Sequence, residues 1–482
     1  MLNRNKVLCV DLDGTFIKTD MLYESFVYHF IRNPLVILYC MYWLSTGGIT
    51  KLKFYLSKSF NFNPSFLPIN YSVLELINAK KSQGYSIYLI SASTERIVQK
   101  IYIAFSDLFD GFFSSKAYSK NDAKSNNRNL KGKNKADFIK KHFPNSIVEY
   151  VGNSRSDIDI WRICDTGYLV TKSTLFSSVT NLKYLDCKCS KNLFSLIFKQ
   201  IRIHQWVKNI LIFVPLITCH TLLSFPLYCS SVLSFFSFCF VASSVYCIND
   251  LVDIDNDRCH ETKKYRPLAS GELPIISGLF IFLISFLIGC SIALIVSFEC
   301  FTLIVCYFLV NLLYSFKFKQ CIVFDCILLS LMYTYRIFIG CIVSNLDISV
   351  WLLSFSFFIF LSLAFIKRYD ELLHLHNRKL VKGRNYLIQD KLVLLMLSIS
   401  SGILSILIFD IYLNTEQVRS SFNLIWIAYF CIPILFNWLA VIYISATRGY
   451  LHNDPIVFAI KNKKSLFLVS IFIVLYLSAA LI

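Results

Sequence analysis

The stretch that decides the fold is NDLVDIDNDRCHETKKYRPLASGEL, residues 249–273, which lies between two long apolar runs. We call it the aspartate-rich segment. It carries six acidic and four basic side chains. Charged groups are costly in a bilayer, and they are scarce beside one unless a function uses them. The surrounding apolar sequence therefore raises the question of what this polar segment does.

The composition indicates a membrane domain joined to a soluble one. Of 482 residues, 56% are hydrophobic, which exceeds the roughly 45–50% of soluble globular chains. Residues 1–200 mix polar and apolar side chains, whereas apolar runs dominate after about residue 207. We therefore expect a soluble α/β domain over 1–170, a linker over 171–192 and an all-α membrane bundle over 193–482.

Apolar runs near the length of about 20 residues that a helix needs to cross a bilayer recur through the membrane half. Nine runs are predicted to span: 209–226, 228–248, 276–296, 299–315, 323–344, 349–366, 391–413, 422–445 and 465–482.

Lys and Arg are distributed unevenly between the connections that join these runs. If the N-terminus lies inside, the inner connections hold 17 of these bases and the outer ones hold only Arg419. Because basic loops stay in the cytoplasm, a multi-pass protein of the inner (cell) membrane is predicted, with its C-terminus outside. No secretory signal opens the sequence, so the N-terminal domain is expected to be cytoplasmic. The aspartate-rich segment and the basic segment 367–390 would then both face the cytoplasm.

The net charge of +18 does not indicate a nucleic-acid partner. The bases gather beside apolar runs, where they set membrane orientation. Most of the 17 cysteines also lie in apolar runs, where they act as small hydrophobic side chains. Cys187 and Cys189 form a CxC pair, but no second pair completes a zinc site.

The acids of the aspartate-rich segment follow a helical spacing. Asn249, Asp253 and Asp257 recur at intervals of four, and Asp250 lies close by, so a continuing helix would place them on one face. Clustered carboxylates repel unless a cation neutralises them, and Mg²⁺ typically binds through one or two carboxylates together with substrate phosphates. This spacing predicts a magnesium site.

Basic side chains follow the acids directly. Lys263, Lys264 and Arg266 offer donors to a diphosphate, Arg as a bidentate fork and Lys as a point charge. A metal with these bases would promote departure of a diphosphate group. A solvated loop that only sets topology would explain the lysines, but not four acids at helical spacing.

The aspartate-rich segment resembles the first aspartate-rich motif of the UbiA superfamily of intramembrane prenyltransferases, which are helical bundles that use Mg²⁺ to bind a diphosphate. IRIHQWVKN (201–209) and the regions 314–340 and 349–372 resemble the branch that transfers phosphoribose from phosphoribosyl diphosphate to decaprenyl phosphate. The resemblance covers nearly all of 200–482. One departure is Glu261 after His260, where that branch usually has proline.

The resemblance implies roles for particular residues of the membrane half. Asn249, Asp250, Asp253 and Asp257 would hold metal and diphosphate, with catalytic roles for Asp253 and Asp257, and Lys263 and Arg266 would bind phosphate. Two charges in the fifth predicted run are further candidates because charge is expensive in lipid: Arg336 and Asp325. A buried structural pair between these two is the alternative. An opposing wall of the site would comprise Lys367 and Arg368 for substrate, Glu371 for metal and Asp370 as another acid.

The N-terminal half carries a second phosphate motif. KVLCVDLDGTFIKTD (6–20) places an apolar strand directly before Asp11 and Asp13. Two acids at a strand end can divide tasks, one attacking a phosphate covalently and the other exchanging protons with the leaving group. The DLDGT signature resembles the haloacid-dehalogenase (HAD) phosphatase superfamily.

Later motifs extend this second resemblance. SIYLISAST (86–94) supplies Ser91 as a phosphate-binding hydroxyl, and KGKNKADFIKKHF (131–143) supplies Lys135, or failing that Lys131. VEYVGNSRSDIDIW (148–161) supplies Asp157 as a Mg²⁺ ligand beside Asp11 and Asp13. Asn153 would be a further, neutral ligand where many members have an acid, so a degenerate scaffold domain remains an alternative to an active phosphatase.

Alternating strands and helices predict a three-layer domain with a parallel sheet whose carboxyl ends hold the site. Residues 21–75 would form a cap. Within it, PLVILYCMYWLST (34–46) is too short to span but suits the membrane surface. Residues 119–134 are interpreted as a flexible basic loop.

Together, the two halves predict an enzyme with two phosphate-handling sites. The membrane domain would transfer phosphoribose from phosphoribosyl diphosphate to a polyprenyl phosphate, and the HAD domain would remove the 5-phosphate from the product. Two alternatives remain: a UbiA-type enzyme that moves a prenyl group from a prenyl diphosphate to an aromatic acceptor, and a lipid-binding membrane scaffold with an inactive HAD domain.

Overall fold

The computed structural model describes residues 5–115, 129–170, 181–185, 192–218, 225–374, 384–422, 424–451 and 455–481. It divides into two compact units, one comprising Met1–Ile201 with Tyr246–Leu283 and the other Arg202–Val245 with Ile284–Ile482. Most of the predicted basic loop and of the predicted linker, including Cys187 and Cys189, lies outside the described residues.

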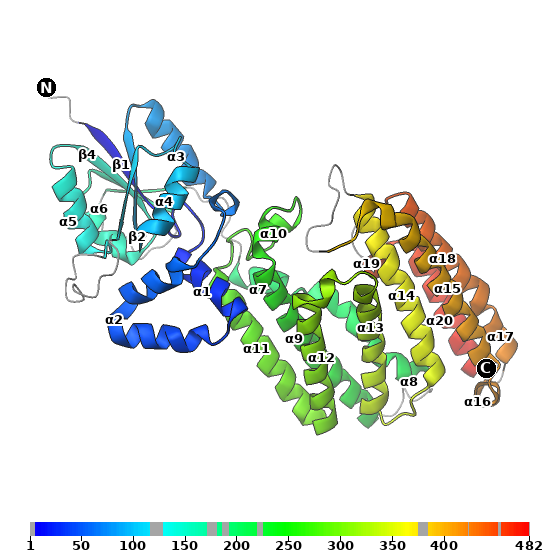
Figure 1. Cartoon of the computed structure of the whole chain (residues 1–482). Coiled ribbons are helices and arrows are strands. Elements are labelled where there is room, and N and C mark those ends of the chain that lie inside the picture. Colours follow the sequence, from blue (N-terminus) through cyan, green and yellow to red (C-terminus); the bar gives the residue numbers. More distant parts are fainter. Residues whose placement is uncertain are drawn as a thin grey trace. The chain divides into compact units, whose positions relative to one another are not determined.

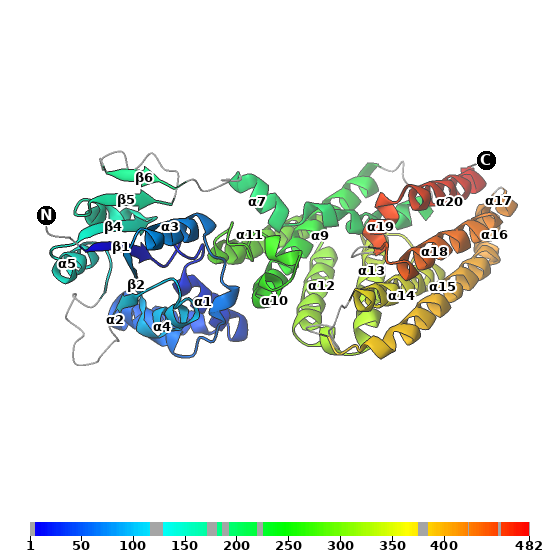
Figure 2. The same cartoon turned by 90° about the horizontal axis from the view of Figure 1, so that it is seen from above.

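The first unit contains a six-stranded sheet in the order β3-β2-β1-β4-β5-β6 (Figures 1 and 2). All adjacent strands pair in parallel, which confirms the predicted sheet. The strands are β1 (Lys6–Asp11), β2 (Ser86–Thr94), β3 (Gly111–Ser115), β4 (Ile147–Gly152), β5 (Thr166–Leu169) and β6 (Leu182–Tyr184). Their continuous apolar runs are typical of parallel strands covered on both faces.

Helices cover both faces of this sheet, so the domain has three layers. One apolar core joins the sheet to α3 (Tyr71–Ser82) and α4 (Glu95–Ala104). The other joins it to α5 (Lys133–His142) and the short α6 (Ile158–Trp161). Successive side chains of a strand point to opposite faces, so in β1 Leu8 and Val10 enter the first core while Val7 and Cys9 enter the second.

The insert after β1 folds as a helical cap within the predicted range. It comprises α1 (Met21–Arg32), α2 (Val36–Lys58) and the short 3-10 helix η1 (Pro64–Phe66). Gly48 kinks α2 with a φ of 63° and a ψ of −163°. Several large apolar side chains near the start of α2 are exposed: Leu35, Ile37, Leu38, Tyr39, Met41, Tyr42 and Leu44. The membrane-surface role of 34–46 stays a prediction.

The aspartate-rich segment belongs to the first unit. Helix α9 (Phe225–Val252) ends inside it, α10 (Ile254–Arg258) and the 3-10 helix η7 (Lys263–Tyr265) follow, and α11 (Ile275–Val296) begins beyond it. Apolar side chains of the segment pack with α1 and with α7 (Leu193–Gln200) in one buried cluster: Val27, Leu196, Leu251, Ile254, Leu268, Leu273 and Ile275.

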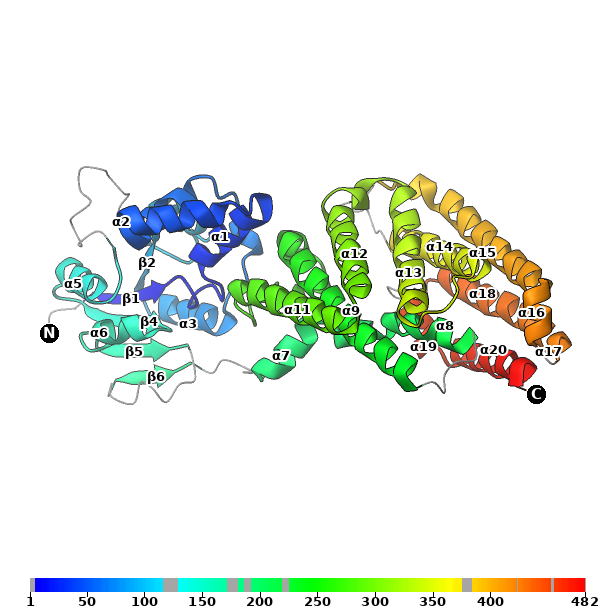
Figure 3. The same ribbon diagram turned by 90° about the horizontal axis from the view of Figure 1, so that it is seen from below.

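The membrane half is a helical bundle, as predicted. Seven helices in the described residues are long and apolar enough to cross a membrane, so the predicted count of nine is not confirmed. These seven spans are Leu227–Val252, Ile275–Val296, Phe298–Phe316, Phe324–Val343, Val350–Leu373, Ile388–Leu413 and Ile425–Thr447 (Figures 1 and 3). The third and fourth predicted runs form separate helices, because Ser297 begins α12 (Phe298–Phe316) as its N-cap by accepting from the amide of Cys300.

The first predicted run, 209–226, does not form one long helix in the described residues. A 3-10 helix, η6 (Ile203–Phe213), is followed by the short α8 (Val214–Thr218), and 219–224 lie outside the described part. Helix η6 packs tightly on α13 (Phe324–Val343): a Cβ built on Gly340 would lie 2.2 Å from the carbonyl oxygen of Ile212. The last predicted run corresponds to α20 (Lys463–Leu481).

Candidate active sites

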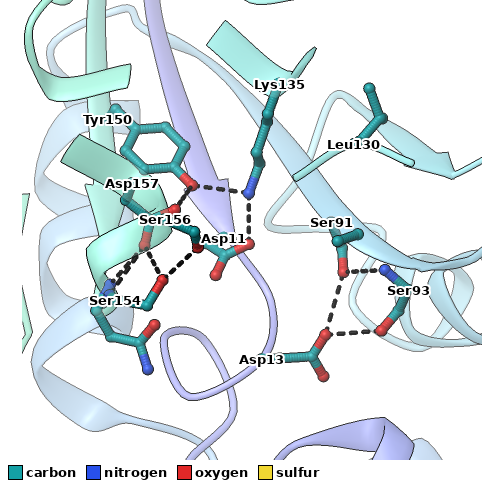
Figure 4. Close-up of polar contacts among 12 residues, drawn as sticks. Asp11, Asp13, Ser91, Ser93, Leu130, Lys135, Tyr150, Ser154, Ser156 and Asp157 are labelled. Carbon is teal, nitrogen blue, oxygen red and sulfur yellow. Dashed lines mark hydrogen bonds and ion pairs between the residues drawn. The ribbon is translucent and has the colours of Figure 1, made fainter. Parts of the chain in front are cut away.

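The first candidate site lies at the carboxyl end of β1, where Asp11 ends the strand (Figure 4). The Lys135 ammonium, at the start of α5, lies 2.5 Å from Oδ1 of Asp11 and also donates to the Tyr150 hydroxyl at 2.7 Å. Tyr150 in turn donates to Oδ1 of Asp157 at 2.9 Å. The structure thus brings together three residues predicted for this site, and it adds Tyr150.

Asp157 is fixed by the loop after β4. Its Oδ2 accepts from the Asn153 amide at 3.2 Å, from the Ser154 amide at 3.0 Å and from the Ser154 hydroxyl at 2.9 Å. These bonds close a capping box on the short 3-10 helix η4 (Arg155–Asp157). These three donors orient the Asp157 carboxylate, whose other oxygen is linked to Asp11 through the hydrogen bonds of Tyr150 and Lys135.

Asp13 has partners of its own. Its Oδ2 accepts from the Ser93 hydroxyl at 2.7 Å and from the Ser91 hydroxyl at 3.3 Å, while its Oδ1 accepts from the amide of Met21 at 2.9 Å. Ser91 therefore lies where the motif predicted, and Ser93 was missed. The signal for Ser93 was present, because residues two apart on a strand share a face.

Asn153 lies directly over the turn that follows the two acids. Gly14 has a φ of 71°, and a Cβ built on it would lie 2.1 Å from Nδ2 of Asn153. No residue other than glycine fits there without displacing the amide. The asparagine therefore packs against this turn, and its role as a neutral metal ligand stays a prediction.

The electrostatics of this site favour a cation. Burial raises the pKa of Asp11 to about 7; the Lys135 charge opposes the rise and the neighbouring Asp157 adds to it. Carboxylate and amide oxygens suit Mg²⁺, so Asp11, Asp157 and Asn153 fit that ion chemically. Within the described ranges, however, no three His, Cys, Asp or Glu side chains are grouped as a metal site requires.

The cap contributes charged groups that the sequence analysis missed. Lys53 of α2 donates to the carbonyl oxygen of Ala92 at 2.9 Å, and burial lowers its pKa against the opposing charges of Asp13 and Asp20. Burial raises the pKa of Asp20 to about 6, and the charge of Asp13 contributes. A small pocket joins cap and core here, and it is lined by Leu22, Ser25, Lys53, Ser93, Thr94 and Ile97.

The second candidate site is the aspartate-rich segment. The Asp253 amide donates to the Asn249 carbonyl at 2.9 Å and the Asp257 amide to the Asp253 carbonyl at 2.8 Å, so the predicted spacing of four is helical. The helix does break, because α9 ends at Val252 and Asp253 caps α10. Oδ1 of Asn249 is buried without a hydrogen-bond partner in the described structure. A buried carbonyl oxygen of this kind fits a Mg²⁺ ligand.

Arg266 bridges two acids of the segment. Its Nη1 lies 2.9 Å from Oδ1 of Asp250 and 2.5 Å from Oδ2 of Asp257. Gln200 donates to the other oxygen of Asp250 at 2.9 Å. Burial raises the pKa of Asp257, and the charges of Arg266 and Lys263 oppose that rise. The base predicted to bind phosphate is therefore held between two predicted metal ligands.

A further ion pair in the segment had no sequence signal. The Arg258 guanidinium donates to both oxygens of Glu24 in the cap helix α1. Only 3% of the Arg258 side chain and 5% of the Glu24 side chain are exposed. The two residues are 234 positions apart, so only the folded chain reveals the pair.

In the second unit, Arg336 is buried, and each nitrogen of its guanidinium donates a hydrogen bond. It donates to Oδ1 of Asn209 at 2.9 Å, to the hydroxyl of Tyr307 at 2.9 Å and to the carbonyl of Met332 at 2.7 Å. Asn209 ends the QWVKN stretch. The alternative of a structural pair between Arg336 and Asp325 is wrong, since each has a different partner.

Asp325 belongs instead to a cluster with Arg368. The Arg368 Nε donates to Oδ2 of Asp325 at 2.6 Å, and its Nη1 lies 3.0 Å from Oε1 of Glu371. Arg384 also donates to Glu371, and the Tyr386 hydroxyl donates to Oδ1 of Asp325 at 2.6 Å. Arg368 and Glu371 thus lie together as predicted. Lys367 precedes them on α14 (Val350–Leu373).

Comparison with known proteins assigns part of the membrane half to a family. Residues 214–415 match the UbiA prenyltransferase family. The uncharacterized protein y4nM of Sinorhizobium fredii is 32% identical over 97% of this chain and 89% of its own length. The nodulation protein NoeC of Azorhizobium caulinodans is 30% identical over 55% of this chain and 87% of its own. The decaprenyl-phosphate phosphoribosyltransferase of Corynebacterium glutamicum is 34% identical, but over only 41% of this chain and 60% of that enzyme.

Solved structures give weaker likenesses. A UbiA homolog from Archaeoglobus fulgidus bound to GPP and Mg²⁺ matches with a TM-score of 0.45 and 13% identity, over 59% of this chain and 98% of that one. A phosphoserine phosphatase with a phospho-aspartyl intermediate analogue matches with a TM-score of 0.27 and 14% identity, over 37% of this chain and 93% of that one. Because both scores are low, the fold assignment rests on the strand order, the helices and the sequence match.

These observations define an integral membrane protein in which an α/β domain with a parallel sheet precedes a UbiA-like helical domain. Residues 214–415 form a domain of the UbiA prenyltransferase family, and the chain shares nearly its whole length with y4nM.

Proposed function

We propose that the chain transfers phosphoribose from phosphoribosyl diphosphate to a polyprenyl phosphate on the cytoplasmic side of the inner membrane. The observation that carries the proposal is the match to decaprenyl-phosphate phosphoribosyltransferases, at 34% identity over 201 residues. The ion pairs between acids and bases in the aspartate-rich segment also support the proposal. In the reaction, a phosphate oxygen of the lipid attacks the anomeric carbon while the bond to diphosphate breaks.

The residues of the segment would divide this work. Asn249, Asp250, Asp253 and Asp257 would hold Mg²⁺, which when bound neutralises charge on the departing diphosphate. Arg266 would turn its fork from the acids toward the diphosphate as metal takes its place, with Lys263 as a second phosphate donor. Arg336, Lys367 and Arg368 would bind substrate from the second unit, with Glu371 as a further metal ligand.

The HAD domain would then remove the 5-phosphate of the lipid-linked sugar. Asp11 would attack the phosphorus and release the sugar alcohol, Asp13 would supply the proton to the leaving oxygen, and Ser91 and Lys135 would hold the phosphate. Asp11, Asp13, Asn153 and Asp157 would hold a second Mg²⁺. Tethering of both activities raises the effective concentration of the intermediate at the second site.

The test uses membranes that contain the full chain, phosphoribosyl diphosphate and decaprenyl phosphate, with Mg²⁺ or with a chelator. Mass spectrometry of the lipids should show decaprenyl-linked ribose with wild type, its 5-phosphate with Asp11→Asn, and neither with Asp253→Asn or with chelator. Absence of any lipid-linked sugar with wild type would refute the proposed transfer.

Transfer of a prenyl group to an aromatic acceptor is the second candidate, because the UbiA family match covers it as well. Competition separates the two. An excess of geranyl diphosphate should leave phosphoribosyl transfer intact if the sugar diphosphate is the donor, and incorporation of the prenyl group into an aromatic acid would favour the second candidate.

A further inference from the structure

The cap helix α1 contacts both candidate sites of the first unit. At its beginning, the Met21 amide donates to Oδ1 of Asp13 at 2.9 Å, and Asp20 caps the helix by accepting from the Leu22 amide at 2.8 Å. One turn further on, Glu24 pairs with Arg258, the residue directly after Asp257. A single helix therefore joins the acid pair of the phosphatase site to the aspartate-rich segment.

The Glu24–Arg258 pair is almost completely buried. An isolated buried charge is very costly, so removal of either partner leaves the other strongly drawn to any remaining opposite charge. For Arg258 such a charge lies within the segment, because Asp255 Oδ1 is 3.8 Å from its guanidinium. Glu24 thus fixes the Arg258 guanidinium against α1 and so fixes the position of α10, which carries Asp257.

Apolar packing and a close backbone approach fix the same contact. Val27 of α1 lies in one buried cluster with Leu251, Ile254 and Leu268 of the segment. Gly271 has a φ of 70°, and a Cβ built on it would lie 2.8 Å from Cβ of Lys18 and 3.1 Å from Cγ of Pro68. Only glycine permits this approach, so the segment and the α/β domain fit each other closely.

We propose that Glu24 is a positioning residue for the transferase: from the phosphatase domain, it holds Arg258 and thereby keeps the aspartate-rich segment in the geometry that binds metal and diphosphate. This inference rests on the proposed function for its kinetic consequence. It also means that the phosphatase cap is a structural part of the diphosphate site, and the fusion is more than a tether between two enzymes.

The test compares full-length wild type, Glu24→Gln, the charge-exchanged double variant Glu24→Arg with Arg258→Glu, and the control Glu75→Gln on an exposed position of α3. Two properties are measured: kcat and KM for phosphoribosyl diphosphate with decaprenyl phosphate, and hydrogen–deuterium exchange of 249–273 in the detergent-solubilised protein. Loss of partners that orient metal ligands costs about 10–100-fold in affinity or activity. We expect Glu24→Gln to raise KM by about that factor with a smaller effect on kcat, and to speed exchange in 249–273.

The double variant should recover most of the KM and slow the exchange again, which a merely structural role for the Glu24 carboxylate in its own helix would not produce. Glu75→Gln should match wild type in both measurements. If Glu24→Gln keeps the wild-type KM or the wild-type exchange of 249–273, the inference is wrong. If wild type itself makes no lipid-linked sugar, the proposed transfer fails, and the exchange measurement alone then decides whether Glu24 orders the segment.

Discussion

Two places in the first unit put acids directly after an apolar element, and they balance those acids in opposite ways. After β1, Asp11 pairs with Lys135, while Asp13 is held by the hydroxyls of Ser91 and Ser93. Asp250 in the last turn of α9 and Asp257 in α10 share one guanidinium, that of Arg266. Separate partners allow two neighbouring acids to carry different charges and tasks, whereas a shared partner makes two acids respond as one.

The difference follows from the two backbones. Asp11 ends β1, whereas Asp13 lies in the turn that follows it, directly before Gly14, so the two side chains reach different neighbours. Asp250 and Asp257 are separated by about two helical turns, and therefore lie on a common side of the helical segment within reach of one base. Each prediction below tests whether this contrast between divided and shared acids holds.

The largest effect is expected from removal of Asp11, the proposed nucleophile of the site at the end of β1, where the acids have separate partners. Asp11→Asn should lower phosphate release from a small phosphomonoester by at least about a thousandfold, since loss of a covalent nucleophile commonly costs that much or more. The exposed Asp137→Asn on α5 is the matched control and should keep wild-type activity. Comparable phosphate release by Asp11→Asn and wild type would mean that the arrangement after β1 is a scaffold.

In the aspartate-rich segment, where two acids share Arg266, Arg266→Lys should lower transferase activity even though the charge is kept. The lysine side chain ends one bond short of the Nη1 atom that contacts both Asp250 and Asp257, and its ammonium cannot offer a bidentate fork to the diphosphate. KM for phosphoribosyl diphosphate should rise by about 10–100-fold, measured as lipid-linked product against donor concentration. Arg162→Lys, at a side chain that is 64% exposed, controls for the exchange itself. A wild-type KM in Arg266→Lys would show that the two acids do not depend on the fork.

The positions of the acids on both sides of this contrast could be predicted from the sequence, because they depend on short local motifs. The DLDGT motif, the residues around Ser91 and the loop 153–157 lie toward the carboxyl ends of β1, β2 and β4. The carboxyl ends of parallel strands meet at one edge of a sheet. The period of four likewise predicted the helical register of Asn249, Asp253 and Asp257. Spacing thus predicted which acids lie close together, whereas their assignment to metal and phosphate came from the resemblance of the motifs to known families.

The partners that balance the acids could not be predicted in the same way. Tyr150 sits inside a buried strand and Glu24 inside a cap helix, and neither position differs in pattern from a structural residue. Arg266 was assigned to phosphate because its type suits phosphate, whereas its place between Asp250 and Asp257 depends on how the chain turns back after η7. The predicted count of nine spans is not confirmed for a related reason, because apolar length alone does not show that residues 203–218 form a 3-10 helix and a short α-helix.

A pH experiment tests whether Lys135 belongs to Asp11 alone. Attack requires ionised Asp11, so phosphatase kcat/KM should climb as pH rises through the pKa of Asp11, which burial places at about 7. The Lys135 charge lowers this pKa, so Lys135→Gln should move the rising limb to higher pH by at least about one unit, whatever it does to the plateau. Added Mg²⁺ should move the limb to lower pH, because a cation favours the carboxylate.

The exposed Lys140→Gln is the control for this profile, and its limb should coincide with that of wild type. An unchanged limb in Lys135→Gln would show that the ionisation of Asp11 is set by another group, and the separation of partners after β1 would then be incomplete.

The smallest effect is expected in the second unit, where an acid has two partners at once. Asp325 accepts from Arg368 on one oxygen and from the Tyr386 hydroxyl on the other, and Tyr386 also accepts from the amide of Val323 at 2.8 Å. Tyr386→Phe removes one donor but leaves the ion pair, so the free energy of unfolding should fall by only about 1–3 kcal/mol. Thermal unfolding in detergent measures this loss, with the 63% exposed Tyr450 changed to Phe as control. A loss well above that range would mean that the hydroxyl, and not Arg368, is the main partner of the buried acid, and that a shared acid can depend on its neutral partner more than on its charged one.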